Sequence, residues 1–248
     1  MRILHGFSRE ACAGALLSPS PLRREVEVDT MRQWALLLAP PLLISSMWGA
    51  FRGFGALLGP KVGYFTAFVC YWLAWCLAFP LWIMRGSGLA GLFRRPTHPL
   101  GKPAWLGLLL LLFPTLGAAV TIFARRLHLA TPLVLLISAV LAIVNAIAEE
   151  VLWRGIYSRV FPRQLVRGYL YPAVGFTLWH LVPQSLHKSR MRGGTKAFLA
   201  GALVIGLGHG WVAWRTGSIR WTTLTHILTD FLGLGGLIYY DPQRSRQQ

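Results

Sequence analysis

The segment TPLVLLISAVLAIVNAIAEEVLWRG, residues 131–155, decides the fold class of this chain. It places two adjacent glutamates, Glu149 and Glu150, at the end of an apolar run with no other charged residue before them. A charged side chain at bilayer depth costs roughly 2.5–3.5 kcal/mol on insertion scales, so acids within such a run indicate function. Only 8 residues of the chain are acidic, and two of them are here. The segment therefore predicts a membrane-spanning helix that carries part of an active site.

The rest of the chain has the same membrane character. Hydrophobic residues make up 54% of the 248 residues and charged residues only 13%, against roughly 25% charged in ordinary soluble domains. Seven apolar stretches have about the length that a helix needs to cross the hydrocarbon core. They are residues 33–51, 62–84, 103–124, 129–153, 168–184, 197–214 and 219–240. We therefore predict an all-α, polytopic helical membrane protein with seven to eight transmembrane helices.

The net charge of +17 is typical of lysines and arginines in the loops beside membrane spans, where anionic lipid attracts them. With seven spans, 15 basic residues lie on the side of the N-terminus and 10 on the opposite side. This bias favours a cytoplasmic N-terminus. Nucleic-acid binding would need a basic face on a soluble fold, and the sequence has none. We expect the lipid bilayer as a partner, and no nucleic acid.

The acidic pair is followed by Arg154, four residues after Glu150. Positions four apart share a helix face, so we predict an ion pair between Glu150 and Arg154 that reduces the cost of burying both. Glu149 lies about 100° further around the helix. It can therefore face a cavity, where a carboxylate can act as general base toward water. The alternative is a helix-end pair that reaches the membrane interface.

Three further polar residues of the predicted spans are site candidates: His180, His226 and Asp230. His226 and Asp230 are four apart, so the carboxylate can orient the imidazole. A single histidine in a span is often only a hydrogen-bonded packing residue, and the pair could be a polar clamp between helices. Three spans that each supply an acid or a histidine favour a shared site. His209 stands in GLGHGW, where the glycines indicate close helix packing, and we place it outside the site.

Three motifs, in order, resemble those of the CPBP family, also called the ABI or CAAX-protease/bacteriocin-processing family. EEVLWR at 149–154, FTLWH at 176–180 and HILTD at 226–230 match its EExxxR, FxxxH and HxxxN/D patterns. The resemblance covers residues 131–240. It implies a CAAX-protease-like helical core with a cavity open toward lipid and cytosol, and an intramembrane endopeptidase activity.

The resemblance also implies a role for each motif residue. Glu149 resembles the general base that activates water, and His180 a second group that positions it. His226 and Asp230 stand where the family stabilises the oxyanion, and Arg154 is implied to support Glu150 structurally. The eukaryotic CAAX endopeptidases have asparagine at the last position. Because an aspartate donates a hydrogen bond only when protonated, Asp230 could instead orient His226.

The resemblance leaves metal dependence open, since members of the family have been described both as metalloproteases and as glutamic proteases. Glu149, His180 and His226 are acceptable zinc ligands, and a catalytic zinc needs about three protein ligands plus water. However, the chain has no HExxH, and no two histidines lie four apart on one helix. We favour a metal-free glutamate mechanism without a cofactor.

These observations predict one membrane-embedded hydrolase, an intramembrane endopeptidase acting on a membrane-associated peptide or protein. The alternative is a non-proteolytic protein for bacteriocin self-immunity or partner scaffolding. A transporter would show inverted repeats with polar residues in both halves, whereas these are confined to the second half. We expect a multi-pass protein of a bacterial inner (plasma) membrane. The predicted parts are a disordered tail (1–30), scaffold transmembrane helices (31–130), the catalytic core (131–240) and a C-terminal tail (241–248).

Overall fold

The computed structural model describes residues 30–85, 88–189 and 191–240. Both predicted tails lie outside this part, apart from Thr30. The described residues form helices and connecting turns, and none of them forms a strand. The helices are α1 (Thr30–Leu58), α2 (Pro60–Cys70), η1 (Tyr71–Ala78), α3 (Phe79–Ile83), η2 (Ala90–Phe93), α4 (Ala104–Ala118), η3 (Ala119–Phe123), α5 (Ala124–Arg126), η4 (Leu127–Leu129), α6 (Pro132–Glu150), η5 (Val151–Gly155), α7 (Ile156–Val160), η6 (Val166–Leu170), α8 (Tyr171–Trp179), α9 (Leu181–Gln184), α10 (Gly194–Thr216), α11 (Arg220–Leu232) and α12 (Gly236–Tyr240).

Five helical segments of the described chain are long and apolar enough to cross a membrane. They are Thr30–Leu58, Pro60–Ile83, Ala104–Leu129, Pro132–Val160 and Gly194–Thr216. The other two predicted spans are interrupted. A turn at His180 separates α8 from α9, and a turn at 233–235 separates α11 from α12. The prediction of an all-α polytopic membrane protein is confirmed, with five of the seven predicted spans meeting the length that a crossing needs.

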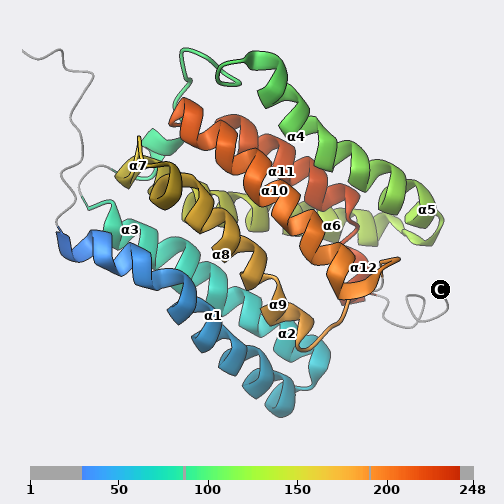
Figure 1. Ribbon diagram of the computed structural model, residues 1–248. Coiled ribbons are helices and arrows are strands. Elements are labelled where there is room, and N and C mark those ends of the chain that lie inside the picture. Colours follow the sequence, from blue (N-terminus) through green and yellow to red (C-terminus); the bar gives the residue numbers. More distant parts are fainter. Residues whose placement is uncertain (1–29, 86–87, 190, 241–248) are drawn as a thin grey trace, which may run out of the picture.

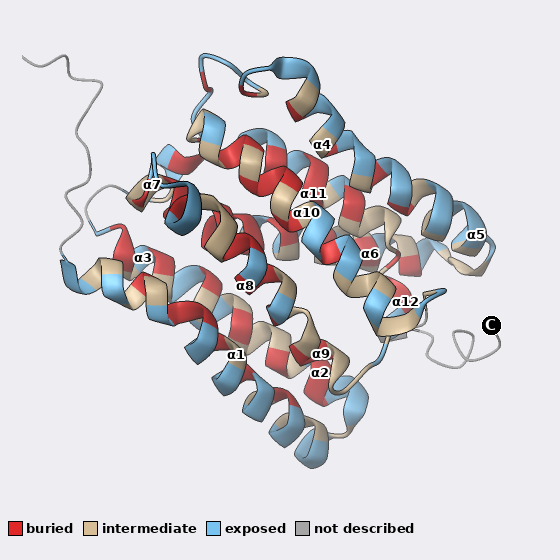
Figure 2. Ribbon diagram, in the orientation of Figure 1, coloured by how far each residue is buried: buried red, intermediate tan, exposed pale blue. Residues whose placement is uncertain are grey.

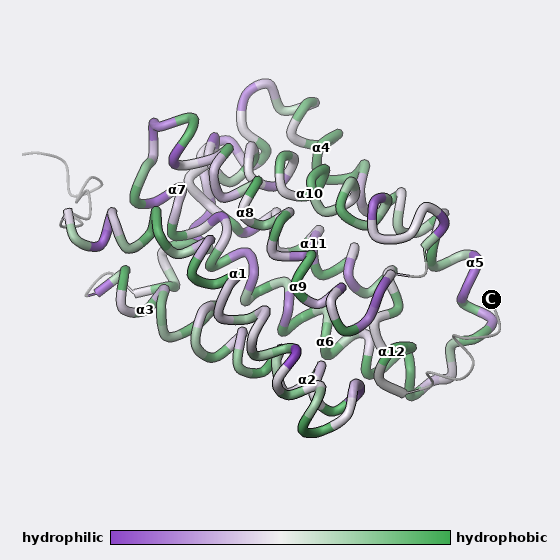
Figure 3. The backbone as a smooth tube through the Cα atoms, turned by 60° about the horizontal axis from the view of Figure 1, so that its bottom comes forward, coloured by the Kyte–Doolittle hydropathy of each residue, from purple (hydrophilic) through white to green (hydrophobic). Residues whose placement is uncertain are grey.

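The outer surface of the helix bundle is apolar. Large hydrophobic side chains are exposed on the outer face of α4, among them Trp105, Leu108, Leu109, Leu112 and Leu116. Figure 2 shows exposed residues along the outward faces of α1 and α4, and Figure 3 shows that much of these helices is hydrophobic. A soluble protein rarely exposes a continuous apolar surface that runs along a whole helix. Contact with lipid accounts for it.

The helices are arranged so that α1 and α4 lie at opposite edges, with α8, α10 and α11 between them (Figure 1). Helix α6 packs against α11 and η1, and α10 packs against both α4 and α8. Two glycines allow this close approach of α10. A Cβ on Gly208 would lie 2.8 Å from the Leu110 carbonyl oxygen, and one on Gly206 would lie 3.0 Å from the Ala173 carbonyl oxygen. Close packing brings one face of α10 into the centre of the bundle.

Candidate active site

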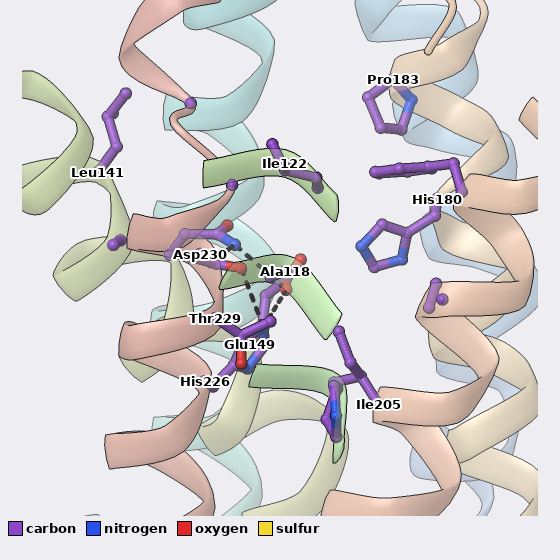
Figure 4. Close-up of a pocket in the computed structure, with 18 of the residues that line it drawn as sticks. Ala118, Ile122, Leu141, Glu149, His180, Pro183, Ile205, His226, Thr229 and Asp230 are labelled. Carbon is purple, nitrogen blue, oxygen red and sulfur yellow. Dashed lines mark hydrogen bonds and ion pairs between the residues drawn. The ribbon is translucent and has the colours of Figure 1, made fainter. Parts of the chain in front are cut away.

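The four candidate catalytic residues line one cavity of about 440 Å³ (Figure 4). Glu149 comes from the end of α6, and His180 from the turn after α8. His226 and Asp230 come from α11. The α2–η1 segment, the α4–η3 segment and α10 also line the cavity. Three motifs that are far apart in the sequence therefore meet at one cavity.

Glu149 is a buried carboxylate that is held from behind. Its Oε1 accepts a hydrogen bond from Trp179 Nε1 at 3.1 Å and one from the Tyr71 hydroxyl at 3.4 Å. Tyr71 is fixed in turn, because Trp153 Nε1 donates to its hydroxyl at 2.8 Å and its ring stacks on Trp179 with centroids 3.9 Å apart. The other oxygen of Glu149, Oε2, faces His226, and His226 Nε2 lies 3.7 Å from Oε2.

Asn145 connects two carboxylates of the site. Its Nδ2 donates to Glu149 Oε2 at 3.3 Å and to Asp230 Oδ2 at 2.9 Å, while its Oδ1 accepts from Trp72 Nε1 at 3.0 Å. Sequence analysis missed Asn145, although its position four residues before Glu149 places both on one helix face. Trp72 and Tyr71 belong to the predicted scaffold region. An aromatic residue in an apolar span gives no signal of such a contact.

Glu150 is fully buried, pairs with the Arg154 charge and accepts hydrogen bonds from two histidines. Its Oε1 lies 3.3 Å from Arg154 Nη1, 3.2 Å from His209 Nδ1 and 2.9 Å from His226 Nδ1. The Arg154 guanidinium also lies 3.9 Å from the centre of the Phe176 ring, a favourable position for a cation. Glu150 therefore fixes the ring of His226, and His209 belongs to this buried cluster. The prediction placed His209 outside the site, and His209 is not among the residues that line the cavity. The close helix packing that its glycines indicate nevertheless brings it to Glu150.

His226 lies between the acidic residues of the site. Its Nδ1 faces Glu150, and its Nε2 lies 3.5 Å from Asp230 Oδ1 as well as 3.7 Å from Glu149 Oε2. The Asp230 side chain is 26% exposed, unlike the other two acids. In the described part of the chain, Glu149, Glu150 and Asp230 are the only acidic residues. All three therefore lie around one imidazole.

His180 lies across the cavity from this cluster, and Figure 4 shows its ring directed into the cavity. Its Nδ1 is 2.7 Å from the Phe176 carbonyl oxygen. A carbonyl only accepts, so Nδ1 carries the hydrogen and Nε2 is left as an acceptor toward the cavity. His180 can therefore hold a water molecule opposite Glu149.

The donor set fits zinc poorly. One group of three His, Cys, Asp or Glu residues in the described chain offers ligand atoms within 4.8 Å of one another, namely Glu150, His209 and His226. Arg154 lies beside the same Glu150 oxygen, and its permanent positive charge repels a divalent cation there. The predicted zinc ligands Glu149, His180 and His226 do not form such a group, because His180 stands on the opposite wall.

Comparison with known proteins finds one similarity, and it lies in this core. Residues 131–232 match the family described as Rce1-like, type II CAAX prenyl endopeptidase Rce1-like. No curated protein and no solved structure matches the chain. The family match confirms the resemblance to the CPBP family, and the matched segment contains all three motifs. It supports a role as a protease, and therefore as a hydrolase, for this multi-pass membrane protein.

Proposed function

We propose that the protein is an intramembrane endopeptidase that hydrolyses a peptide bond of a membrane-associated peptide or protein. One observation carries the proposal. A buried glutamate, Glu149, has one oxygen anchored by two donors and the other beside His226, at the wall of a cavity that His180 also lines. A fixed carboxylate in a largely apolar cavity is suited to accept a proton from water.

In the proposed reaction, Glu149 acts as the general base. A water molecule between Glu149 Oε2 and His180 Nε2 gives its proton to the glutamate, and its oxygen attacks the substrate carbonyl carbon. The tetrahedral intermediate collapses as the C–N bond breaks, and Glu149 returns the proton to the departing amine. The products are one new carboxyl group and one new amino group. His180 directs the lone pair of the water and takes no proton itself.

His226 stabilises the oxyanion in this proposal. When the ring is protonated, Nδ1–H donates to Glu150 and Nε2–H is free to donate to the negative oxygen. Asp230 lies 3.5 Å from Nε2 and helps to orient the ring. A hydrogen-bond donor that is already held in place stabilises the developing negative charge strongly in a cavity of low dielectric. Glu150 and Arg154 support this arrangement and do not contact the substrate.

The walls of the cavity suit an apolar, membrane-associated substrate. Besides the polar residues above, the lining includes Phe113, Ala118, Ile122, Leu141 and Ile205. Peptides that end in a prenylated cysteine followed by three residues are the first class to test, because the matched family is described as a prenyl endopeptidase. The bacterial inner membrane is the proposed location.

The proposal is tested with purified protein in liposomes and two internally quenched peptides, one farnesylated on cysteine and one not. We expect cleavage of the farnesylated peptide, with one ¹⁸O atom from labelled water in the new carboxyl group. Glu149→Gln protein serves as the matched blank. If neither peptide is cleaved faster than by this blank, the proposal is overturned and the non-proteolytic alternative gains support.

A metal-free mechanism predicts that chelation leaves the cleavage rate unchanged. Asp230→Asn should also keep kcat within about tenfold of the parent, a loss below about 1.4 kcal/mol of transition-state stabilisation, because an asparagine amide can donate toward the oxyanion. Both are measured as initial rates after dialysis against a strong chelator, with zinc content determined by mass spectrometry. Chelator-sensitive activity that zinc restores, together with inactive Asp230→Asn protein, would instead establish a metalloprotease.

A further inference from the structure

Asn145 is a polar residue of the cavity that belongs to none of the three motifs. It lies on α6, one turn before Glu149, and lines the cavity. The amide oxygen and both amide N–H groups have hydrogen-bond partners. The two N–H groups are directed to Glu149 Oε2 at 3.3 Å and to Asp230 Oδ2 at 2.9 Å, and the oxygen accepts from Trp72 at 3.0 Å.

The indole of Trp72 determines which way this amide faces. An indole N–H can only donate, so it pairs with the amide oxygen and requires the NH₂ group to point away from it. The NH₂ group then faces the two carboxylates, each of which can accept one of its hydrogens. Trp72 comes from η1 and Asp230 from α11. A chain of hydrogen bonds therefore crosses from η1 through α6 to α11.

The charges in this cluster require such a donor. Glu149 and Asp230 both lie within 3.7 Å of the same His226 nitrogen, and two carboxylates that close repel each other unless donors lie between them. Asn145 supplies a donor to each without adding a charge. An aspartate of the same shape would remove both N–H groups and add a third acid.

We propose that Asn145 is a positioning residue for the hydrolysis, which holds the Glu149 and Asp230 carboxylates in a fixed relative geometry. Trp72 orients the Asn145 amide for this task. The inference rests on the proposed function. Misplacing a reacting group by about 1 Å can lower a rate about 100-fold, so the effect of Asn145 should be on kcat. Substrate binding uses the wider cavity and should change little.

The test measures kcat and KM on the farnesylated quenched peptide for four variants. Asn145→Leu and Asn145→Asp both remove the two N–H donors. The leucine adds no charge, and the aspartate keeps the shape of the side chain. Each should lower kcat about 100-fold and leave KM within about threefold. Trp72→Phe removes the orienting indole N–H and keeps an aromatic ring of smaller size, and we expect a smaller loss of about three- to tenfold. Ser46→Ala is the control, since its hydroxyl bonds to Leu43 of its own helix at 3.1 Å, and its kcat should not change.

A double-mutant cycle separates positioning from packing. If Trp72 acts through Asn145, adding Trp72→Phe to Asn145→Leu should lower kcat by less than about twofold more, whereas independent effects would multiply. Unchanged kcat in Asn145→Leu, a loss confined to Asn145→Asp, or fully multiplicative effects would each overturn the inference. If the parent and Ser46→Ala proteins are no faster than Glu149→Gln, the proposed function itself is overturned.

Discussion

Replacing Glu149 by glutamine is expected to abolish peptide hydrolysis while the protein remains folded. The glutamine oxygen can still accept from Trp179 and Tyr71, which donate to Glu149 Oε1 in the parent. Its amide nitrogen cannot take a proton from water. General-base catalysis contributes typically 10²–10⁴-fold, so kcat should fall by at least about 100-fold. Initial rates on the farnesylated quenched peptide in liposomes measure this loss.

The same variant offers a route to the natural substrate. Because Glu149→Gln keeps the cavity, it should retain bound substrate that the parent protein cleaves. Proteomics of material that co-purifies from native membranes should therefore show peptides enriched on this variant. Its thermal unfolding should stay close to that of the parent, because the glutamine loses only the hydrogen bond that Asn145 donates to Glu149 Oε2 at 3.3 Å. A Glu149→Gln protein that keeps more than about a tenth of the parent kcat would be incompatible with its role as general base.

Replacing Arg154 by alanine is expected to lower the amount of folded protein. Glu150 is fully buried, and Arg154 is its partner with permanent charge, at 3.3 Å. Removing one member of a buried ion pair costs about 3–5 kcal/mol, because the other charge is left without compensation. Loss of the guanidinium contact with the Phe176 ring at 3.9 Å adds to this. Thermal unfolding in detergent and the yield of monodisperse protein measure the change.

Two companion variants make the Arg154 result specific. Arg167→Ala removes an exposed arginine, and its unfolding temperature should stay at the parent value. Arg154→Ala combined with Glu150→Gln should recover part of the lost stability, because the buried charge is then gone as well. If Arg154→Ala protein is obtained in normal amount, unfolds like the parent and is as inactive as Glu149→Gln, Arg154 has a catalytic role and the division between the two glutamates is wrong.

The sequence was sufficient to predict the helical membrane fold. A long apolar segment in lipid must satisfy its backbone hydrogen bonds internally, and a helix does so. The sequence was less reliable on individual spans. Residues 168–184 and 219–240 are the predicted spans that contain the site histidines, and turns at His180 and at 233–235 interrupt them. One turn places the His180 ring beside the cavity, so the interruption serves the candidate site.

Local spacing along the chain determined which residues share a helix face, as with Glu150 and Arg154 or His226 and Asp230. It could not determine which faces meet. The contacts of Tyr71 and Trp179 with Glu149, of His209 with Glu150, and of Trp72 with Asn145 all join different helices. Tertiary packing alone decided these contacts, because a tryptophan, tyrosine or asparagine in an apolar span looks the same whether its polar atom faces a carboxylate or only its own helix.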